Sequence, residues 1–281
     1  MIQITVENHL GQQLAISNDA FPVTSVEGLT PAGATINTAG AGIADGTFFN
    51  SSYVNQRNIV LTIVPNGDAE QARLTLYRYL KPKYSCRLYF TTNTRQVYID
   101  GYVETFEGSL FENRQAFQIS IICPNPFFID VNSGELIQSF ITNAFTFPVS
   151  IPEEGIMFSN ITMGTSLNVE NAGEESTGIV IDLIATGNVV EPTIYNETTR
   201  ETFTLNVEMV TGDLITIDTR KGHKTITLNR EGVTTNILNT MEQGSTWFLL
   251  PQGDNYFTFT CAYGAVNLKI EYMLYVLYEG V

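Results

Sequence analysis

Residues 98–128 read YIDGYVETFEGSLFENRQAFQISIICPNPFF, and this stretch decides the fold of the first half of the chain. Residues 96–104 and 116–123 alternate apolar with polar side chains, which is the period-two pattern of half-buried strands. A polar connection at residues 106–114 joins them and predicts a hairpin. The Pro-Asn-Pro at 124–126 ends the sheet, because proline has no N–H to donate to a strand ladder. We expect this hairpin to close an N-terminal β domain.

The residues before the hairpin predict more strands and one helix. Strand patterns occur at residues 2–6, 12–16, 48–55, 59–64 and 86–91, with an extended edge segment at 20–27. The helix is expected at about residues 68–81, with Asp68 as its N-cap. Its apolar stripe is Ala69, Ala72, Leu76 and Leu80. The glycine-rich residues 28–46 have neither GxGxxG nor GK[ST] spacing, so we expect a flexible loop there and no phosphate site.

Four basic residues gather on and just after the predicted helix. They are Arg73, Arg78, Lys81 and Lys83. Two readings stay open: a solvated helix face, or a contact with a neighbouring subunit.

The second half predicts an antiparallel β domain without a helix. Strand patterns follow one another at residues 178–186, 192–196, 202–208, 213–218, 224–228, 247–250, 256–261 and 266–276. Residues 253–255, Gly-Asp-Asn, are expected to form a turn. Such close spacing is typical of a sandwich or barrel. We therefore expect a mainly β protein with an N-terminal domain at 1–130, a linker at 131–150 and a C-terminal domain at 151–281.

Composition restricts the possible functions. The 281 residues are 43% hydrophobic and 15% charged, which favours an ordered β protein over a disordered chain. The net charge is −15: residues 1–130 carry 8 Lys or Arg and 11 Asp or Glu (−3), and residues 131–281 carry 6 and 18 (−12). Specific nucleic-acid binding needs a basic footprint, and none is present. The acidity favours either solubility alone or a surface past which DNA slides without binding.

The sequence offers no constellation typical of an enzyme. The two histidines, His9 and His223, have no nucleophile motif beside them, and no cluster of residues is suited to a metal or cofactor. Paired glutamates such as Glu153-Glu154 are expected to be solvated loop acids. We predict no catalytic residues, no cofactor and no metal. The N-terminus has no signal-peptide pattern, and no apolar run is long enough to span a membrane.

Two smaller features were considered for binding and redox roles. The scattered cysteines, Cys86, Cys123 and Cys261, are expected to be buried free thiols of a protein made in the cytosol. The lone tryptophan, Trp247, could stack on a sugar ring, but its apolar neighbours favour a core or half-buried position. Carbohydrate binding during adsorption to a host surface is the alternative function, and action on a cell-wall polymer is a third.

The chain resembles the distal tail protein family of long-tailed (siphovirus-type) bacteriophages. The resemblance rests on Arg-Leu-Tyr-Phe at 87–90, Gly-Tyr-Val-Glu at 101–104 and Ile-Cys-Pro-Asn-Pro-Phe-Phe at 122–128. In the second half, Gly-Asp at 212–213 and Leu-Pro-Gln-Gly-Asp-Asn at 250–255 extend it.

This resemblance implies a split-barrel-like N-terminal domain with one helix, and a C-terminal domain that is a galectin-like β-sandwich. It also implies a homohexameric ring in the tail tip of the virion, assembled in the host bacterial cytoplasm. The expected partners are the tail tube protein, the tail hub, and receptor-binding or accessory baseplate proteins, with DNA passing through the channel. Specific nucleic-acid binding, membrane insertion and catalysis are not expected.

Overall fold

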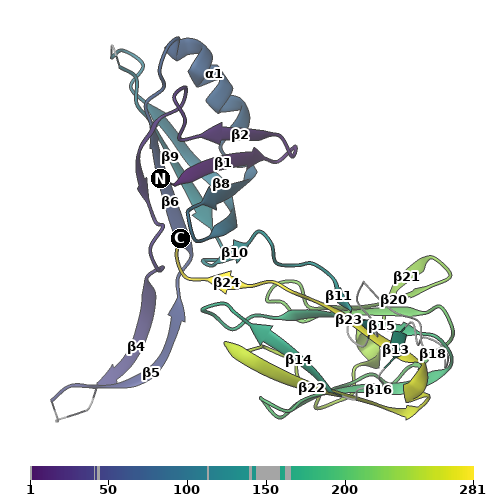
Figure 1. The fold of residues 1–281 in the computed structure, drawn as a ribbon. Helices are drawn as coiled ribbons and strands as arrows, with labels where there is room; N and C mark the ends of the chain where they lie inside the picture. Colours follow the sequence, from purple (N-terminus) through teal and green to yellow (C-terminus); the bar gives the residue numbers. More distant parts are fainter. Residues whose placement is uncertain are drawn as a thin grey trace, which may run out of the picture. The chain divides into compact units, whose positions relative to one another are not determined.

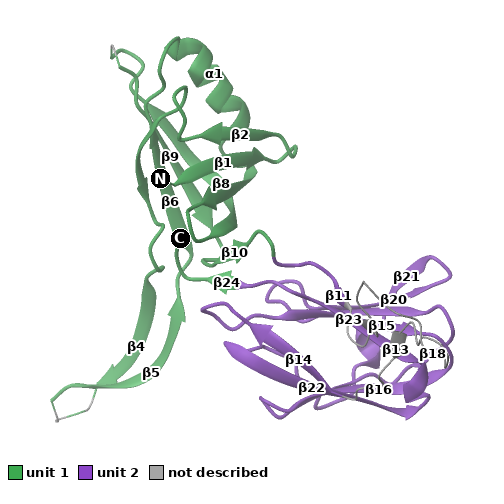
Figure 2. Cartoon of the chain, in the orientation of Figure 1, with its two compact units in different colours: residues 1–132, 277–281 green, residues 133–276 purple. Residues whose placement is uncertain are grey.

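The computed structural model describes residues 2–40, 42, 45–112, 114–138, 141–143, 159–161 and 166–281. The chain divides into two compact units (Figures 1 and 2). Unit 1 comprises Met1–Asn132 with Leu277–Val281, and unit 2 comprises Ser133–Val276. Residues 139–140 and 144–150 of the expected linker at 131–150, together with Glu153-Glu154, lie outside the described residues.

Unit 1 is built on one antiparallel sheet with the strand order β2-β1-β7-β8-β9-β6-β3. Its strands are β1 (Gln3–Asn8), β2 (Gln13–Ile16), β3 (Val23–Glu27), β6 (Arg57–Ile63), β7 (Ser85–Thr91), β8 (Gln96–Gly108) and β9 (Phe117–Cys123). The edge strands β2 and β3 do not pair with each other in the described part of the chain, so the sheet is not a closed barrel. The expected edge position of residues 20–27 is confirmed by β3.

The predicted helix is confirmed as α1 (Ala69–Tyr79). The Asp68 side chain accepts hydrogen bonds from the backbone N–H groups of Glu70 and Gln71, which caps the otherwise unpaired first turn. Leu76 and Leu80 of the predicted stripe are fully buried in the core of unit 1. That core is formed by the inward side of the sheet, where the apolar half of each alternating strand points.

The hairpin at 96–123 is confirmed, with Tyr102 paired to Ile122 and Val103 to Ile121. Its connection was placed too early: β8 continues to Gly108, so the connection spans 109–116. The reason is that Phe106, read as part of a polar loop, packs on the rings of Tyr77 and Phe117.

The hairpin does not close unit 1. β10 (Phe128–Asp130) follows it and pairs with β8, and also with β24 (Leu277–Tyr278), which comes from the end of the chain. The chain therefore leaves unit 1 after Asn132 and returns to it after Val276. No local pattern in the sequence predicted this return.

Residues 28–46 are not a loop throughout, which corrects that expectation. β4 (Ala34–Gly40) pairs with β5 (Thr47–Val54) in a separate two-stranded sheet. The β-branched residues Thr35, Ile36 and Thr38 favour an extended backbone in spite of the surrounding glycine and alanine. We refer to β4, β5 and the turn between them as the arm; it projects from the rest of unit 1 (Figure 1).

Unit 2 contains two larger sheets around one core. The first has the order β11-β23-β15-β19-β20-β21, and the second β14-β22-β16-β17 with β18 beside β16. The first sheet comprises β11 (Ile137–Gln138), β15 (Ile179–Ala185), β19 (Leu214–Asp218), β20 (Thr225–Arg230), β21 (Val233–Asn236) and β23 (Leu268–Leu274). The second comprises β14 (Ser166–Asn171), β16 (Val189–Asn196), β17 (Glu201–Thr204), β18 (Glu208–Met209) and β22 (Gly253–Tyr263); β12 (Ile141–Asn143) pairs with β13 (Ser159–Ile161). The protein is thus mainly β, as expected.

Three local predictions in unit 2 were wrong. Residues 247–250 form no strand; only Leu250 makes an isolated bridge, to Thr177. Residues 253–255 are not a turn but the start of β22, because they pair with β14. The segment 202–208 is divided between β17 and β18. Its apolar residues Phe203 and Leu205 are nevertheless buried in the core of unit 2.

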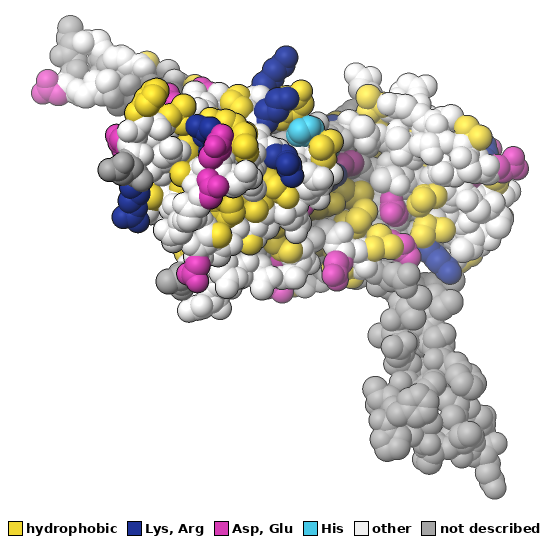
Figure 3. Space-filling view, turned by 90° about the horizontal axis from the view of Figure 1, so that it is seen from above, with side chains coloured by type: hydrophobic (Ala, Val, Ile, Leu, Met, Phe, Trp, Pro, Cys, Tyr) yellow, Lys and Arg dark blue, Asp and Glu magenta, His cyan; other side chains and the backbone are white. Residues whose placement is uncertain are grey.

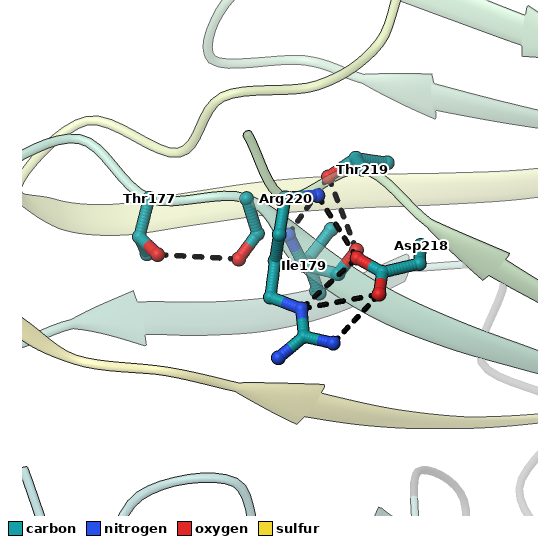
Figure 4. A network of polar contacts seen from close by, with 6 residues as sticks. Thr177, Ile179, Asp218, Thr219 and Arg220 are labelled. Atoms are coloured by element: carbon teal, nitrogen blue, oxygen red, sulfur yellow. Dashed lines mark hydrogen bonds and ion pairs between the residues drawn. The ribbon is translucent and has the colours of Figure 1, made fainter. Parts of the chain in front are cut away.

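A polar network secures the turn after β19 (Figure 4). The Thr219 hydroxyl accepts a hydrogen bond from Ile179 N (2.8 Å) and donates one to Ile179 O (3.0 Å). Arg220 is paired with Asp218 (Nη2–Oδ2 2.7 Å), and its guanidinium lies 4.2 Å from the centre of the Tyr275 ring. The buried Thr219 hydroxyl and the Asp218 carboxylate thus have hydrogen-bond partners, as buried polar groups require.

A second ion pair in unit 2 involves a buried carboxylate. The Asp213 side chain, 1% exposed, accepts from Arg230 Nε (2.9 Å), Arg230 Nη2 (2.6 Å) and Val210 N (2.8 Å). The hydrogen bonds from Arg230 are the main reason that the pKa of Asp213 is lowered.

We expect Asp213→Asn to lower the free energy of unfolding of unit 2 by about 2–3 kcal/mol at pH 7. The asparagine side chain is neutral and has one accepting oxygen in place of two, so it cannot replace the carboxylate as the partner of Arg230. The pKa of Asp213 is lower in the folded state, so its contribution is complete above the unfolded pKa of about 4 and is lost as the pH falls through the folded pKa. Urea unfolding at pH 7 and at pH 3 measures this difference, which should shrink at pH 3. Glu170→Gln, at an exposed position of β14, is the control.

Candidate interaction surfaces

The arm exposes more apolar surface than a stable water-facing ribbon normally does. Every residue of β5 is exposed, and so is all of β4 except the half-buried Thr35. The large apolar side chains are Ile36 (57% exposed), Phe48 (67%), Phe49 (65%) and Tyr53 (58%). An isolated two-stranded hairpin is marginally stable in water, and exposed apolar clusters mark contact sites.

The two edges of the arm are also open. Neither β4 nor β5 pairs with any other strand of the described chain, so each leaves one row of backbone N–H and C=O groups without a strand partner. The register shifts between Asn37 and Thr38, which is typical of a bulge and adds twist. Charged residues that usually protect an open edge are absent from both strands.

A second surface lies on and after α1, where the basic residues gather. Arg78, Lys81 and Lys83 form no ion pair with any residue that the structure describes, whereas Arg73 lies 3.8 Å from Glu70. Leu74 and Tyr77 are exposed on the same helix. Figure 3 shows Lys and Arg side chains among hydrophobic ones on the face that carries α1. Both readings of this patch, solvated face or subunit contact, stay predictions.

The outward side of β1, β7 and β8 is polar and carries a hollow of about 380 Å³. Arg87 and Asp100 form a two-pronged ion pair there, with Nε–Oδ1 2.6 Å and Nη2–Oδ2 3.0 Å. The Tyr89 hydroxyl donates to Glu7 at 3.0 Å. The thiol of Cys86, also at the hollow, has its pKa raised to about 12 by burial, so it is protonated and a poor nucleophile. The hollow is a structured polar surface and offers no activated group.

The other cysteines are equally unreactive. Cys123 is buried and Cys261 is partly buried, and burial raises their thiol pKa values to about 12 and about 11. Burial was expected for all three cysteines, and it is confirmed fully for Cys86 and Cys123.

Trp247 lies half-buried at the edge of the core of unit 2. Its ring meets Phe203 edge to face, with centroids 5.4 Å apart, and the Lys224 ammonium lies 5.6 Å from its centre. This is the packed position that its apolar neighbours predicted. Sugar binding by Trp247 remains a prediction that no contact in the structure tests.

The two histidines considered for chemistry belong to different units. His9 packs on Tyr84 in unit 1, with ring centroids 4.4 Å apart, and His223 lies in the turn between β19 and β20 of unit 2. In the residues that the structure describes, no group of three or more His, Cys, Asp or Glu could hold a metal ion. Within the same residues, no helix has the length and apolar character needed to cross a bilayer.

Known proteins resemble this chain in one domain by sequence and in both by fold. Residues 172–274 match the family model for the C-terminal domain of siphovirus-type tail components (SPP1_Dit). No curated protein sequence matches the chain. The crystal structure of SPP1 Dit (gp 19.1), described as a paradigm of the hub adsorption apparatus in Gram-positive infecting phages, is similar with a TM-score of 0.68 and 15% identity over 98% of both chains.

Two structures of the phage P2 baseplate in its activated conformation are similar as well. The one with Ca has a TM-score of 0.57 and 12% identity over 100% of both chains, and the one with Sr has 0.55 and 12% over 98% of both. At these identities the likeness shows the fold, whereas the family model adds a sequence relationship for most of unit 2. Residues 172–274 therefore carry the C-terminal domain of siphovirus-type tail components, and the chain as a whole has the fold of SPP1 Dit and of the similar chains in the phage P2 baseplate.

Proposed function

We propose that this protein assembles into a closed ring of six identical subunits that joins the tail tube to the tail hub. The observation that carries the proposal is the arm, with its exposed apolar side chains and open edges in unit 1. Rings require a heterologous contact, in which one patch of a subunit meets a different patch of the next. A projecting ribbon that is unstable in water alone is suited to be one half of such a contact. The arm is thus proposed to lie against a neighbouring copy of this chain.

In this proposal the two domains have different tasks. Residues 1–130 form the ring, and residues 151–281, after a linker at 131–150, anchor receptor-binding or accessory baseplate proteins. The related chains come from a hub adsorption apparatus and from baseplates, which supports assembly with other tail proteins. Residues 1–130 carry a net charge of −3, so the proposed ring has no excess of positive charge that would hold passing DNA. The protein would be built into the virion after synthesis in the host cytoplasm.

Light scattering over a concentration series tests the ring directly. We expect a species of six times the 31.1 kDa chain, and a six-fold ring in negative-stain images. Addition of the tail tube and hub proteins should stabilise this species if they are its axial partners. A chain that stays monomeric at all concentrations, alone and with both partners, would contradict the proposal.

We expect Phe48→Ser combined with Phe49→Ser to raise the concentration needed for assembly at least tenfold. The two rings are 67% and 65% exposed, so their replacement removes apolar area from the contact and leaves the core of unit 1 unchanged. Light scattering measures the assembly, and circular dichroism checks that the variant is folded.

The matched control is Tyr263→Ser in unit 2. Tyr263 is 68% exposed, close to each of the two phenylalanines, so the control removes one comparable ring at a position outside the arm, and Phe48→Ser alone is its direct counterpart. Equal assembly of the wild type and the arm variant would show that the arm is not the ring contact.

A further inference from the structure

Arg57, the first residue of β6, is a buried cation that is held by backbone carbonyl groups. It is 3% exposed, and its guanidinium donates to four backbone carbonyls: Gly28 O, Thr30 O, Pro126 O and Glu279 O, at 2.5–2.6 Å. Its Cζ lies 4.5 Å from the centre of the Phe128 ring. Only a planar fork of five N–H donors can serve so many acceptors at once. One side chain thus joins three separate segments of unit 1.

Two of those acceptors belong to the root of the arm. Residues 28–33 lead into β4, and residues 55–56 lead from β5 to Arg57 itself. The root is tightly fitted: Asn55 N donates to Gly33 O at 2.9 Å, and a Cβ at Gly28 (φ +85°) would lie 2.1 Å from Asn58 O. Arg57 therefore holds both sides of the point from which the arm projects.

A third acceptor is Pro126 O, directly after the hairpin. The fourth, Glu279 O, belongs to residues 277–281, which we call the strap. Besides Glu279 O on Arg57, Gly280 O accepts from Arg95 Nη1 at 3.0 Å, and the Arg95 guanidinium lies 4.3 Å from the Tyr278 ring centre. Val281 N donates to Leu29 O at 3.1 Å, directly on the root. The strap starts immediately after the last residue of unit 2, Val276.

We infer that Arg57 and the strap form a latch that positions the arm, so that the arm becomes competent for assembly only when the strap is docked on Arg57 and on the root. Arg57 acts here as a positioning residue, because it shapes the root and does not belong to the arm. Without the strap, one carbonyl partner of Arg57 and the hydrogen bond to Leu29 are missing. A chain without the strap would then present a poorly ordered arm and would not enter a ring. This inference rests on the proposed function of the arm.

Deletion of residues 277–281 in the otherwise full chain tests the latch, with hydrogen–deuterium exchange and light scattering as readouts. We expect the amides of residues 28–33 and 55–57 to exchange at least tenfold faster, and the assembly concentration to rise at least tenfold. Amides of β7 and β8 should keep their protection and show that unit 1 is folded. Unchanged exchange at the root, or a loosened root with unchanged assembly, would overturn the inference.

Arg57→Lys is the second variant, and it decides the question if the deletion unfolds unit 1. Lysine keeps the charge, but its three donors cannot serve four carbonyls in a plane, so the same loosening of the root is expected. Arg114→Lys makes the same exchange at an exposed position in the connection between β8 and β9 and should change neither readout. A wild type that forms no ring would refute the proposed function, while the exchange of the root amides would still decide whether the latch exists.

Discussion

Arg57→Ala is expected to lower the free energy of unfolding of unit 1 by about 3–5 kcal/mol, since each buried carbonyl that loses a charged donor costs about 1–3 kcal/mol. Four carbonyls lose their donor, and the Phe128 ring loses the cation beside it. The expected loss is smaller than the sum over four carbonyls, because burial of the charged guanidinium itself costs free energy in the wild type. This desolvation also lowers the pKa of Arg57, and the alanine variant no longer has this cost. Water can enter the space and satisfy part of the remaining carbonyls.

Urea unfolding followed by a probe confined to unit 1 measures this change. Arg78→Ala removes the same side chain from an exposed position and should change the stability by less than about 0.5 kcal/mol. A loss below about 1 kcal/mol for Arg57→Ala would show that the four hydrogen bonds contribute little net stability. The stability of unit 2 serves as an internal reference, because it has a core of its own.

The fold of unit 1 was predictable where side chains alternate and a single face is buried. Along β8, Val97, Ile99 and Val103 are buried, and along β9 Phe117, Ile119 and Ile121 are, as period-two alternation requires. α1 was predictable for the same reason, with a stripe of period 3.6 and an Asp cap. In these elements local pattern and tertiary environment agree, so sequence alone is sufficient.

Half of the arm was predicted: the strand at 48–55 is confirmed as β5, whereas β4 was missed. A strand is recognised in sequence by one buried face, and β4 has no buried residue, with Thr35 alone half-buried. Residues 28–46, which contain β4, are rich in Gly, Ala and Thr and therefore resemble a loop in composition. If a neighbouring subunit covers the arm, the information that explains its sequence lies outside the single chain. The sequence therefore did not predict β4, which is one of the two strands of the proposed contact.

The latch was missed for a different reason, which is distance along the chain. Arg57 and Glu279 are 222 residues apart, and Arg95 and Gly280 are 185 residues apart. The acceptors are backbone carbonyls, which every residue has, so no residue type marks them in the sequence. A single Arg with an otherwise apolar strand after it was the only available signal. The family resemblance, in contrast, rested on local motifs and was confirmed by the family model in unit 2.

Gly264→Ala is expected to lower the free energy of unfolding of unit 2 by about 3–4 kcal/mol, the sum of two separate effects. Gly264 directly follows β22 and has φ +81°, a left-handed conformation that costs an L-residue about 1–2 kcal/mol. In addition, a Cβ there would lie 1.9 Å from Asn188 O, which is far closer than a carbon atom can approach a non-bonded oxygen. Either the turn or the segment before β16 must move.

That movement costs free energy because the turn at residues 264–267 is hydrogen-bonded to residues 186–188. Asn267 Nδ2 donates to Asn188 O at 3.1 Å, and Thr186 N donates to Asn267 O at 2.8 Å. A shift of the turn away from Asn188 weakens both bonds at once, and each contributes about 1 kcal/mol. The segment cannot retreat instead, because Val189 behind it is fully buried in the core.

Gly222→Ala separates the two effects in the same unit. Gly222 has φ +82°, almost the angle of Gly264, but no atom lies within 4 Å of the position that a Cβ would take. We expect this control to lose only the conformational share, about 1–2 kcal/mol. Urea unfolding of unit 2 measures both variants. A difference of about 2 kcal/mol between them would be the contribution of the close approach at Asn188, which is two hydrogen bonds of about 1 kcal/mol each. If both variants lose the same free energy of unfolding, the turn at Gly264 can move without cost. The positions of β22 and β23 would then not depend on the contact with the segment before β16.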